Sequence, residues 1–80
     1  MPSFLYFWTD EIEQHLREHG VSTREFEFVV TNCREPQQSR STGLPVAEGY
    51  TQNGRWLVCV YVLIDVLTVL PVTAYEPEPL

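Results

Sequence analysis

Two histidines are the residues of this chain best suited to proton transfer. His15 and His19 are four residues apart, which places both side chains on one face of a helix. Because a histidine titrates near neutral pH, either imidazole could act as a general acid or base. The pair could also begin a metal site, but no cysteine or further ligand lies nearby, so we expect neither a metal nor a cofactor. The alternative is that both rings pack at a helix edge, where a histidine near the C-terminus interacts favourably with the helix dipole.

The arginines are a second group of residues that could take part in binding or catalysis. All five basic residues are arginines, and Arg34, Arg40 and Arg55 occupy one stretch that contains only two acids, Glu35 and Glu48. Guanidinium groups bind phosphate oxygens, so this stretch could contact a nucleic-acid backbone. The chain as a whole has 11 acids and a formal net charge of −6, which argues against general nucleic-acid affinity. The alternative is a solvated connector, where polar residues are normally found.

The two cysteines do not have the spacing of a metal or redox motif. Cys33 and Cys59 are far apart in the sequence, and neither belongs to a CxxC or Cys/His pattern. The first residues also lack the pattern of a secretory signal. We therefore expect a cytoplasmic protein with two reduced, partly buried thiols, and a disulfide is the less favoured alternative.

The Asn53-Gly54 pair stands between two apolar runs and predicts a β-hairpin with a two-residue type I′ turn. In that register Tyr50 faces Leu57, and alternate residues point to opposite faces of the sheet. We assign one face to the core, namely Pro45, Ala47, Gly49, Thr51, Trp56, Val58, Val60 and Val62. The other face is mixed, and it carries Arg55, Tyr50 and Tyr61 together with Glu48, Cys59 and the apolar residues Leu44, Val46, Leu57 and Leu63.

The remaining segments predict one α+β domain over residues 1–75 and an acidic, disordered tail over 76–80. Ser22 and Glu25 have the spacing of a capping box, and Val21 and Phe26 that of a hydrophobic staple. The expected elements are a strand at 4–8, a helix from Thr9 or Asp10 to His19, a helix at 23–32, a polar connector at 34–43 with an extended part near 38–41, the hairpin, and a last strand at 66–75. The order is thus β-α-α-β-β-β, with two helices packed on one face of a small, mainly antiparallel sheet.

The last strand leaves one open question and one alternative. Pro71 cannot donate to a strand ladder, so we expect a free edge or a bulge there. Residues 56–74 are also long enough to span a membrane as a helix. Asp65 at the centre, Pro71 and the many β-branched residues argue against that alternative, and we expect no membrane association.

The order of these elements and several of their residues resemble the BrnT-type toxins and related toxin-like proteins of the RelE-like superfamily. The resemblance covers nearly the whole chain and rests on short motifs in a common order. The matching parts are the aromatic segment at 4–8 with Asp10, the helix end at 19–22, the arginine-containing connector, and the segment 54–58 with Tyr61.

The resemblance implies a toxin of a type II toxin–antitoxin system, a metal-independent endoribonuclease that inhibits translation. It implies that His19, Arg40, Arg55 and Tyr61 are the catalytic residues. Arginines would stabilise phosphate charge, and the histidine or tyrosine would transfer protons. Tyr50, Arg34 and His15 are the accompanying candidates for RNA binding. The implied partners are an antitoxin protein and RNA or the ribosome.

A second hypothesis follows from what this chain lacks. It contains no lysine, and its last residues are acidic, whereas the toxins that it resembles are usually basic. The alternative is therefore a toxin-fold protein without catalysis that binds a protein partner or forms a homodimer. Leu57, Leu63, Val46 and Leu44 would form an exposed apolar patch on a small monomer, which favours such a partner.

Overall fold

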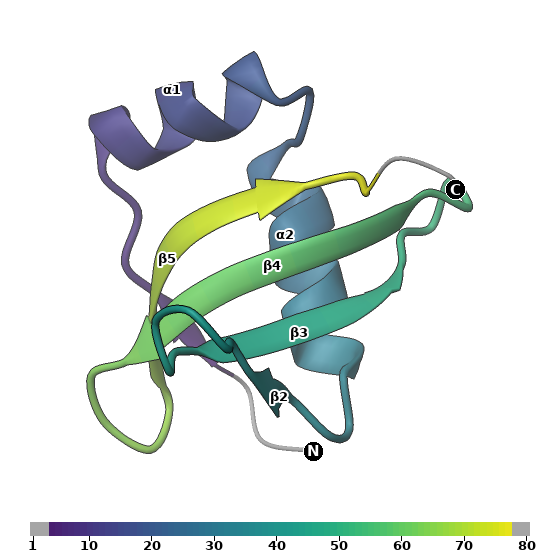
Figure 1. Ribbon diagram of the computed structural model, residues 1–80. Helices are drawn as coiled ribbons and strands as arrows, with labels where there is room; N and C mark the ends of the chain where they lie inside the picture. The colour runs from purple at the N-terminus through teal and green to yellow at the C-terminus, as the bar shows by residue number, and fades with distance from the viewer. Residues whose placement is uncertain (1–3, 78–80) are drawn as a thin grey trace.

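Two helices and five strands make up the described part of the chain, residues 4–77 of this computed structural model (Figure 1). In chain order they are β1 (Leu5–Tyr6), α1 (Asp10–Glu18), α2 (Thr23–Asn32), β2 (Gln37–Gln38), β3 (Pro45–Tyr50), β4 (Trp56–Leu63) and β5 (Thr68–Tyr75). The sheet order is β1-β5-β4-β3-β2, with β1 parallel to β5 and the other neighbours antiparallel. The predicted α+β class and order of elements are confirmed, and the connector adds the short strand β2.

Both helices begin where the sequence predicts. The Thr9 side chain accepts a hydrogen bond from the backbone N–H of Ile12 at the start of α1. The capping box of α2 is present, because Ser22 Oγ accepts from the Glu25 N–H at 3.1 Å while Glu25 Oε1 accepts from the Ser22 N–H at 3.0 Å. Val21 and Phe26 are both buried, as the staple requires. Gly20, with φ of 72°, turns the chain between the two helices.

The hairpin between β3 and β4 differs from the prediction in its turn. Asn53 does not have a positive φ, so the turn is not type I′; only Gly54, at φ 83°, adopts the left-handed conformation. The Gly54 N–H donates to the Thr51 carbonyl and the Thr51 N–H donates to the Arg55 carbonyl. The loop therefore has three residues, a turn followed by a left-handed glycine.

The extra loop residue moves the register by one and exchanges the faces of β4. Tyr50 pairs with Trp56 instead of Leu57, and Ala47 pairs with Cys59. A shift of one residue turns every side chain of a strand to the opposite face. The core assignment was therefore wrong for Trp56, Val60 and Val62. Val58 is buried, as predicted, but on the face opposite the helices. The predicted mixed face containing both Tyr50 and Tyr61 does not exist. The residues of β4 that enter the core are Leu57, Cys59 and Tyr61.

One core joins the sheet to both helices. Figure 1 shows α2 behind β3 and β4, and α1 lies against β5. The assignment of β3 to the core was right at Ala47, which is fully buried, and Gly49 faces Val29 of α2, where a Cβ would make an ordinary contact at 3.8 Å. The core residues are Leu16, Val21, Phe26, Val29, Val30, Ala47, Leu57, Cys59, Tyr61, Val69 and Ala74. We call this side of the sheet the inner face and the opposite side the outer face.

The last strand follows a turn that is fixed by Asp65. Its Oδ1 accepts from the backbone N–H groups of Leu67 and Thr68, both at 2.9 Å, and these hydrogen bonds lower the pKa of the carboxyl. The expected irregularity at Pro71 is confirmed, because Val60 pairs with Thr73 whereas Tyr61 pairs with Pro71. No helix within residues 4–77 has the length and apolarity needed to cross a membrane.

The two ends of the domain are attached to the sheet. β1 pairs with the start of β5, Leu5 with Thr68 and Tyr6 with Val69. After β5, the side chain of Glu76 forms an ion pair with Arg55 at 3.3 Å. The rest of the predicted disordered tail, residues 78–80, lies outside the described residues.

The face assignment of β4 can be tested with two leucines of the same strand. Leu57 is fully buried and Leu63 is 44% exposed. We expect Leu57→Ala to lower the free energy of unfolding by about 2–5 kcal/mol, because it opens a cavity in the core. Leu63→Ala should cost about 1 kcal/mol or less. Urea unfolding measures both, and equal effects would contradict the observed register.

Candidate functional site

The candidate residues from the sequence do not form one site. His19 is exposed at the end of α1, which lies against β5. Arg40 is exposed in the turn after β2, at the opposite edge of the sheet, and Arg34 is exposed at the end of α2. Two strands, β4 and β3, separate β5 from β2. The histidines and the connector arginines therefore lie at opposite ends of the strand order and do not meet at one site.

The two histidines lie together, as their spacing predicts. Their ring centroids are 4.9 Å apart in an edge-to-face arrangement, and His15 Nε2 shares a hydrogen bond of 2.8 Å with Thr73 Oγ1 on β5. This contact packs His15 between helix and sheet, which is the structural alternative considered for it. Within residues 4–77, no group of three or more histidine, cysteine or acidic side chains is positioned to hold a metal ion.

Arg55 is held by the protein's own acceptors. Its Nη1 donates to the Gly20 carbonyl at 2.9 Å and to Glu25 Oε2 at 3.0 Å, while Nη2 donates to Glu76 Oε1 at 3.3 Å. One guanidinium thus joins the turn between the helices, the first turn of α2 and the end of β5. Its charge is compensated by two carboxylates, so Arg55 has a structural role in this conformation.

Tyr61 belongs to the core. Only 2% of the residue is exposed, on the inner face, and burial raises the pKa of its phenol. The neighbouring inner-face residue Cys59 is fully buried, and burial raises the pKa of its thiol to about 12. Both groups are therefore protonated at neutral pH and shielded from solvent.

Tyr50, unlike Tyr61, is a tyrosine candidate that the structure exposes to solvent. It is 65% exposed on the outer face, and its ring meets that of its cross-strand partner Trp56 edge to face, with centroids 4.8 Å apart. Tyr75 stands on the same face, because it pairs with Val58 and Val58 pairs with Glu48. We call the group of Glu48, Tyr50, Trp56, Val58 and Tyr75 the aromatic patch.

Sequence reasoning missed most of this patch. Trp56 and Val58 were assigned to the core because the predicted turn was one residue too short. The face of the sheet on which Tyr75 lies was not predicted, because the sequence did not determine the register of the last strand. With a three-residue loop, the alternation of Trp56, Val58 and Val60 against Leu57, Cys59 and Tyr61 would have placed the first set outside.

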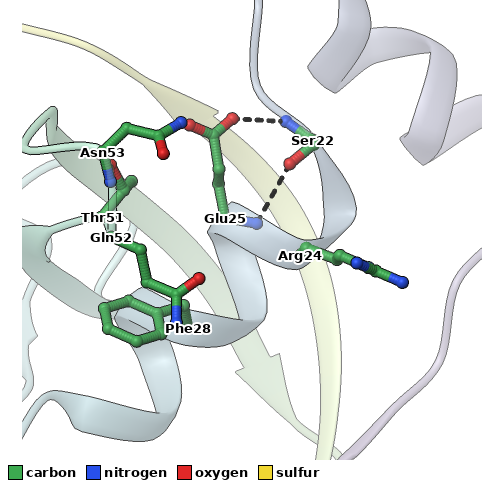
Figure 2. A pocket seen from close by; sticks show the side chains of 7 residues that line it. All are labelled: Ser22, Arg24, Glu25, Phe28, Thr51, Gln52 and Asn53. Atoms are coloured by element: carbon green, nitrogen blue, oxygen red, sulfur yellow. Dashed lines mark hydrogen bonds between the residues drawn. The ribbon is translucent and has the colours of Figure 1, made fainter.

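A shallow surface hollow of about 260 Å³ lies between the start of α2 and the hairpin loop (Figure 2). Its lining residues are Ser22, Arg24, Glu25, Phe28, Thr51, Gln52 and Asn53. In Figure 2 the Arg24 side chain points away from the hollow, and Glu25 is engaged with Ser22 in the capping box. Ser22 and Glu25 here stabilise the start of α2, and Thr51 stabilises the hairpin loop.

Comparisons with protein-family models, with curated proteins and with solved structures find no match for this chain.

The structural role of Arg55 can be measured by double-mutant cycles. The Arg55 and Glu25 side chains are 30% and 16% exposed, whereas that of Glu76 is 51% exposed. We expect a coupling energy of about 1 kcal/mol between Arg55→Met and Glu25→Gln in urea unfolding, and less than about 0.5 kcal/mol between Arg55→Met and Glu76→Gln. Gln at position 25 keeps a capping-box acceptor, so it isolates the ion pair. A stronger coupling to Glu76 would contradict this ranking.

Proposed function

We propose that this protein is a protein-binding module whose partner covers the outer face of the sheet at the aromatic patch. The observation that carries the proposal is the exposure of three aromatic side chains side by side in the strand register. Tyr50, Trp56 and Tyr75 are 65%, 39% and 43% exposed. In the described part of the chain neither helix lies over them, since α2 packs on the inner face and α1, which contacts β5, contributes Leu16 to the same core (Figure 1).

The residue types of the patch are those of binding surfaces. Tyrosine and tryptophan are enriched at the centres of protein interfaces, where they provide large contact areas with few rotatable bonds. Val58, which is 6% exposed, lies between Glu48 and Tyr75 in the register and gives the patch an apolar floor. Aromatic side chains on a solvent-facing sheet leave apolar surface in contact with water, and a partner that covered this surface would gain free energy from its burial.

Charge favours a protein partner over a nucleic acid or an anionic membrane. The chain has a net charge of −6 and no lysine. Arg55, which adjoins Trp56 in the sequence, is bound to Glu25 and Glu76. The patch itself contains one charged residue, Glu48, and polyanions would be repelled from it. A second copy of the chain is less suitable, because it would bring two acidic surfaces together.

The endoribonuclease function that the resemblance implies stays a prediction. The geometry supports it less well, because Tyr61 is buried, Arg55 is ion-paired, and His19 and Arg40 lie toward opposite edges of the sheet. Induction in a bacterial host distinguishes the two functions. A binding module leaves bulk protein synthesis equal in wild type, Arg40→Ala and Arg55→Ala at matched soluble levels. An arrest of synthesis by wild type that either substitution relieves would favour the ribonuclease.

Site-specific photo-crosslinking tests the binding function directly. A benzophenone amino acid is placed at Tyr50 or Val60 on the outer face, or at Glu18 on α1 as an exposed control, in cells of the natural source. We expect one discrete protein adduct from the outer-face positions and none from Glu18. Adding Trp56→Asp should remove the adduct while leaving the circular-dichroism spectrum unchanged.

Three outcomes would contradict the proposal. The first is the absence of an adduct from both outer-face positions, and the second is an equally strong adduct from Glu18. An adduct of twice the chain's own mass would identify a second copy as the occupant and would overturn the assignment to a different partner.

A further inference from the structure

We infer that the aromatic patch receives a cationic side chain, the guanidinium of an arginine or the ammonium of a lysine, from the partner. The inference rests on the proposed function and specifies its chemistry. The four groups of the patch that would contact the cation are the rings of Tyr50, Trp56 and Tyr75 and the carboxylate of Glu48.

The strand register arranges these four side chains around Val58. Glu48, Val58 and Tyr75 form one row across β3, β4 and β5. Tyr50 and Trp56 form the next row, two residues further along β3 and β4, and they point to the same side. A group above Val58 would therefore have Glu48 on one flank, Tyr75 on the other, and the Tyr50–Trp56 pair at one end.

The rings leave room for a cation to contact their faces. The Tyr50 and Trp56 planes are inclined at 78° with centroids 4.8 Å apart, so the edge of one ring contacts one face of the other. This arrangement leaves at least one face of each ring without contact from the other ring. A cation within about 6 Å of a ring centroid is attracted to the negative face of the aromatic system, most strongly for tryptophan. Because Tyr50 is the most exposed of the three, a side chain can enter from solvent without moving the strands.

The charge of the patch selects a cation over an anion. Glu48 is exposed and forms no ion pair with another residue of the segment 4–77. The nearest cation along the chain, Arg55, has its guanidinium bound to Gly20, Glu25 and Glu76. The carboxylate and the three rings of the patch therefore present one negative charge without an ion pair within residues 4–77 beside three negative ring faces, which is complementary to a positive side chain.

Tyr50 and Trp56 have a simpler explanation as a cross-strand pair that stabilises the hairpin. That role needs neither Tyr75 nor Glu48 and predicts no response to a cation. The two explanations therefore differ in what a small cationic ligand does to the patch.

Titration with Nα-acetyl-arginine amide, followed by two-dimensional NMR, separates them. The indole N–H of Trp56 reports on the patch, and that of Trp8, which donates to Glu27 at 2.7 Å, is an internal control. We expect saturable shifts of the Trp56 indole and of the amides of Glu48, Tyr50 and Tyr75, with the Trp8 indole unchanged. Nα-acetyl-citrulline amide, which has nearly the same shape without the charge, should bind at least about threefold more weakly.

Matched variants assign the effect to the patch. Glu48→Gln should weaken arginine-amide binding by about two- to fivefold, whereas Glu11→Gln, which removes the same charge from the exposed side of α1, should not change it. Tyr50→Leu should weaken it to a similar degree. Equal binding of the arginine and citrulline compounds to wild type, or an effect of Glu11→Gln as large as that of Glu48→Gln, would overturn the inference.

The failure of this inference and that of the proposed function give different results. A partner crosslinked at Tyr50 together with no binding of the arginine compound would leave a binding module that recognises an apolar group. Binding of the arginine compound without a crosslinked protein would leave a cation site and would remove the protein-binding function.

Discussion

The hydrogen bonds of Thr51 determine which side of the sheet faces the core. Thr51 is 6% exposed, its carbonyl accepts from the Gly54 N–H, and its hydroxyl oxygen accepts from the N–H groups of Asn53 and Arg55. These bonds close a loop of three residues instead of two. Because the loop has three residues and not two, Leu57, Cys59 and Tyr61 face the helices, whereas Trp56 and Val58 lie on the outer face. It also brings Arg55 to the turn between the helices, where its ion pairs connect α2 with the end of β5.

Much of the fold was predictable because its signals are local. Ser22, Glu25 and Phe26 specify the start of a helix whatever surrounds them, and Gly20 specifies the turn before it. Pro71 indicated a free edge or a bulge in β5, because proline cannot donate a backbone hydrogen bond. The face of β4 was not predictable in this way, because Trp56, Val58 and Val60 are as apolar as Leu57, Cys59 and Tyr61. Asn-Gly is compatible with either loop, and the choice depends on hydrogen bonds made by a buried threonine side chain.

The candidate site depended on that same choice. In the predicted register Tyr50, Arg55 and Tyr61 share a face, which favours phosphate chemistry. In the structure Tyr61 is in the core, and Arg55 is ion-paired with Glu25 and Glu76. Tyr50 lies with Trp56, Tyr75 and Glu48 on the outer face. We propose that this arrangement is a recognition surface, because it is aromatic and half-exposed and its carboxylate, Glu48, has no ion pair within residues 4–77. The sequence did not predict this grouping, because Glu48 and Tyr75 are far apart along the chain and the register that aligns them depends on the bulge near Pro71.

The most direct test of this account is a measurement of cross-strand contacts between Hα protons in solution. In an antiparallel pair, residues that do not exchange hydrogen bonds bring their Cα atoms closest. The observed register predicts nuclear Overhauser effects between the Hα protons of Tyr50 and Trp56 and between those of Glu48 and Val58. A two-residue loop would instead pair Thr51 with Trp56 and Gly49 with Val58. Those contacts would return Trp56 to the core, and the aromatic patch with both proposals built on it would be lost.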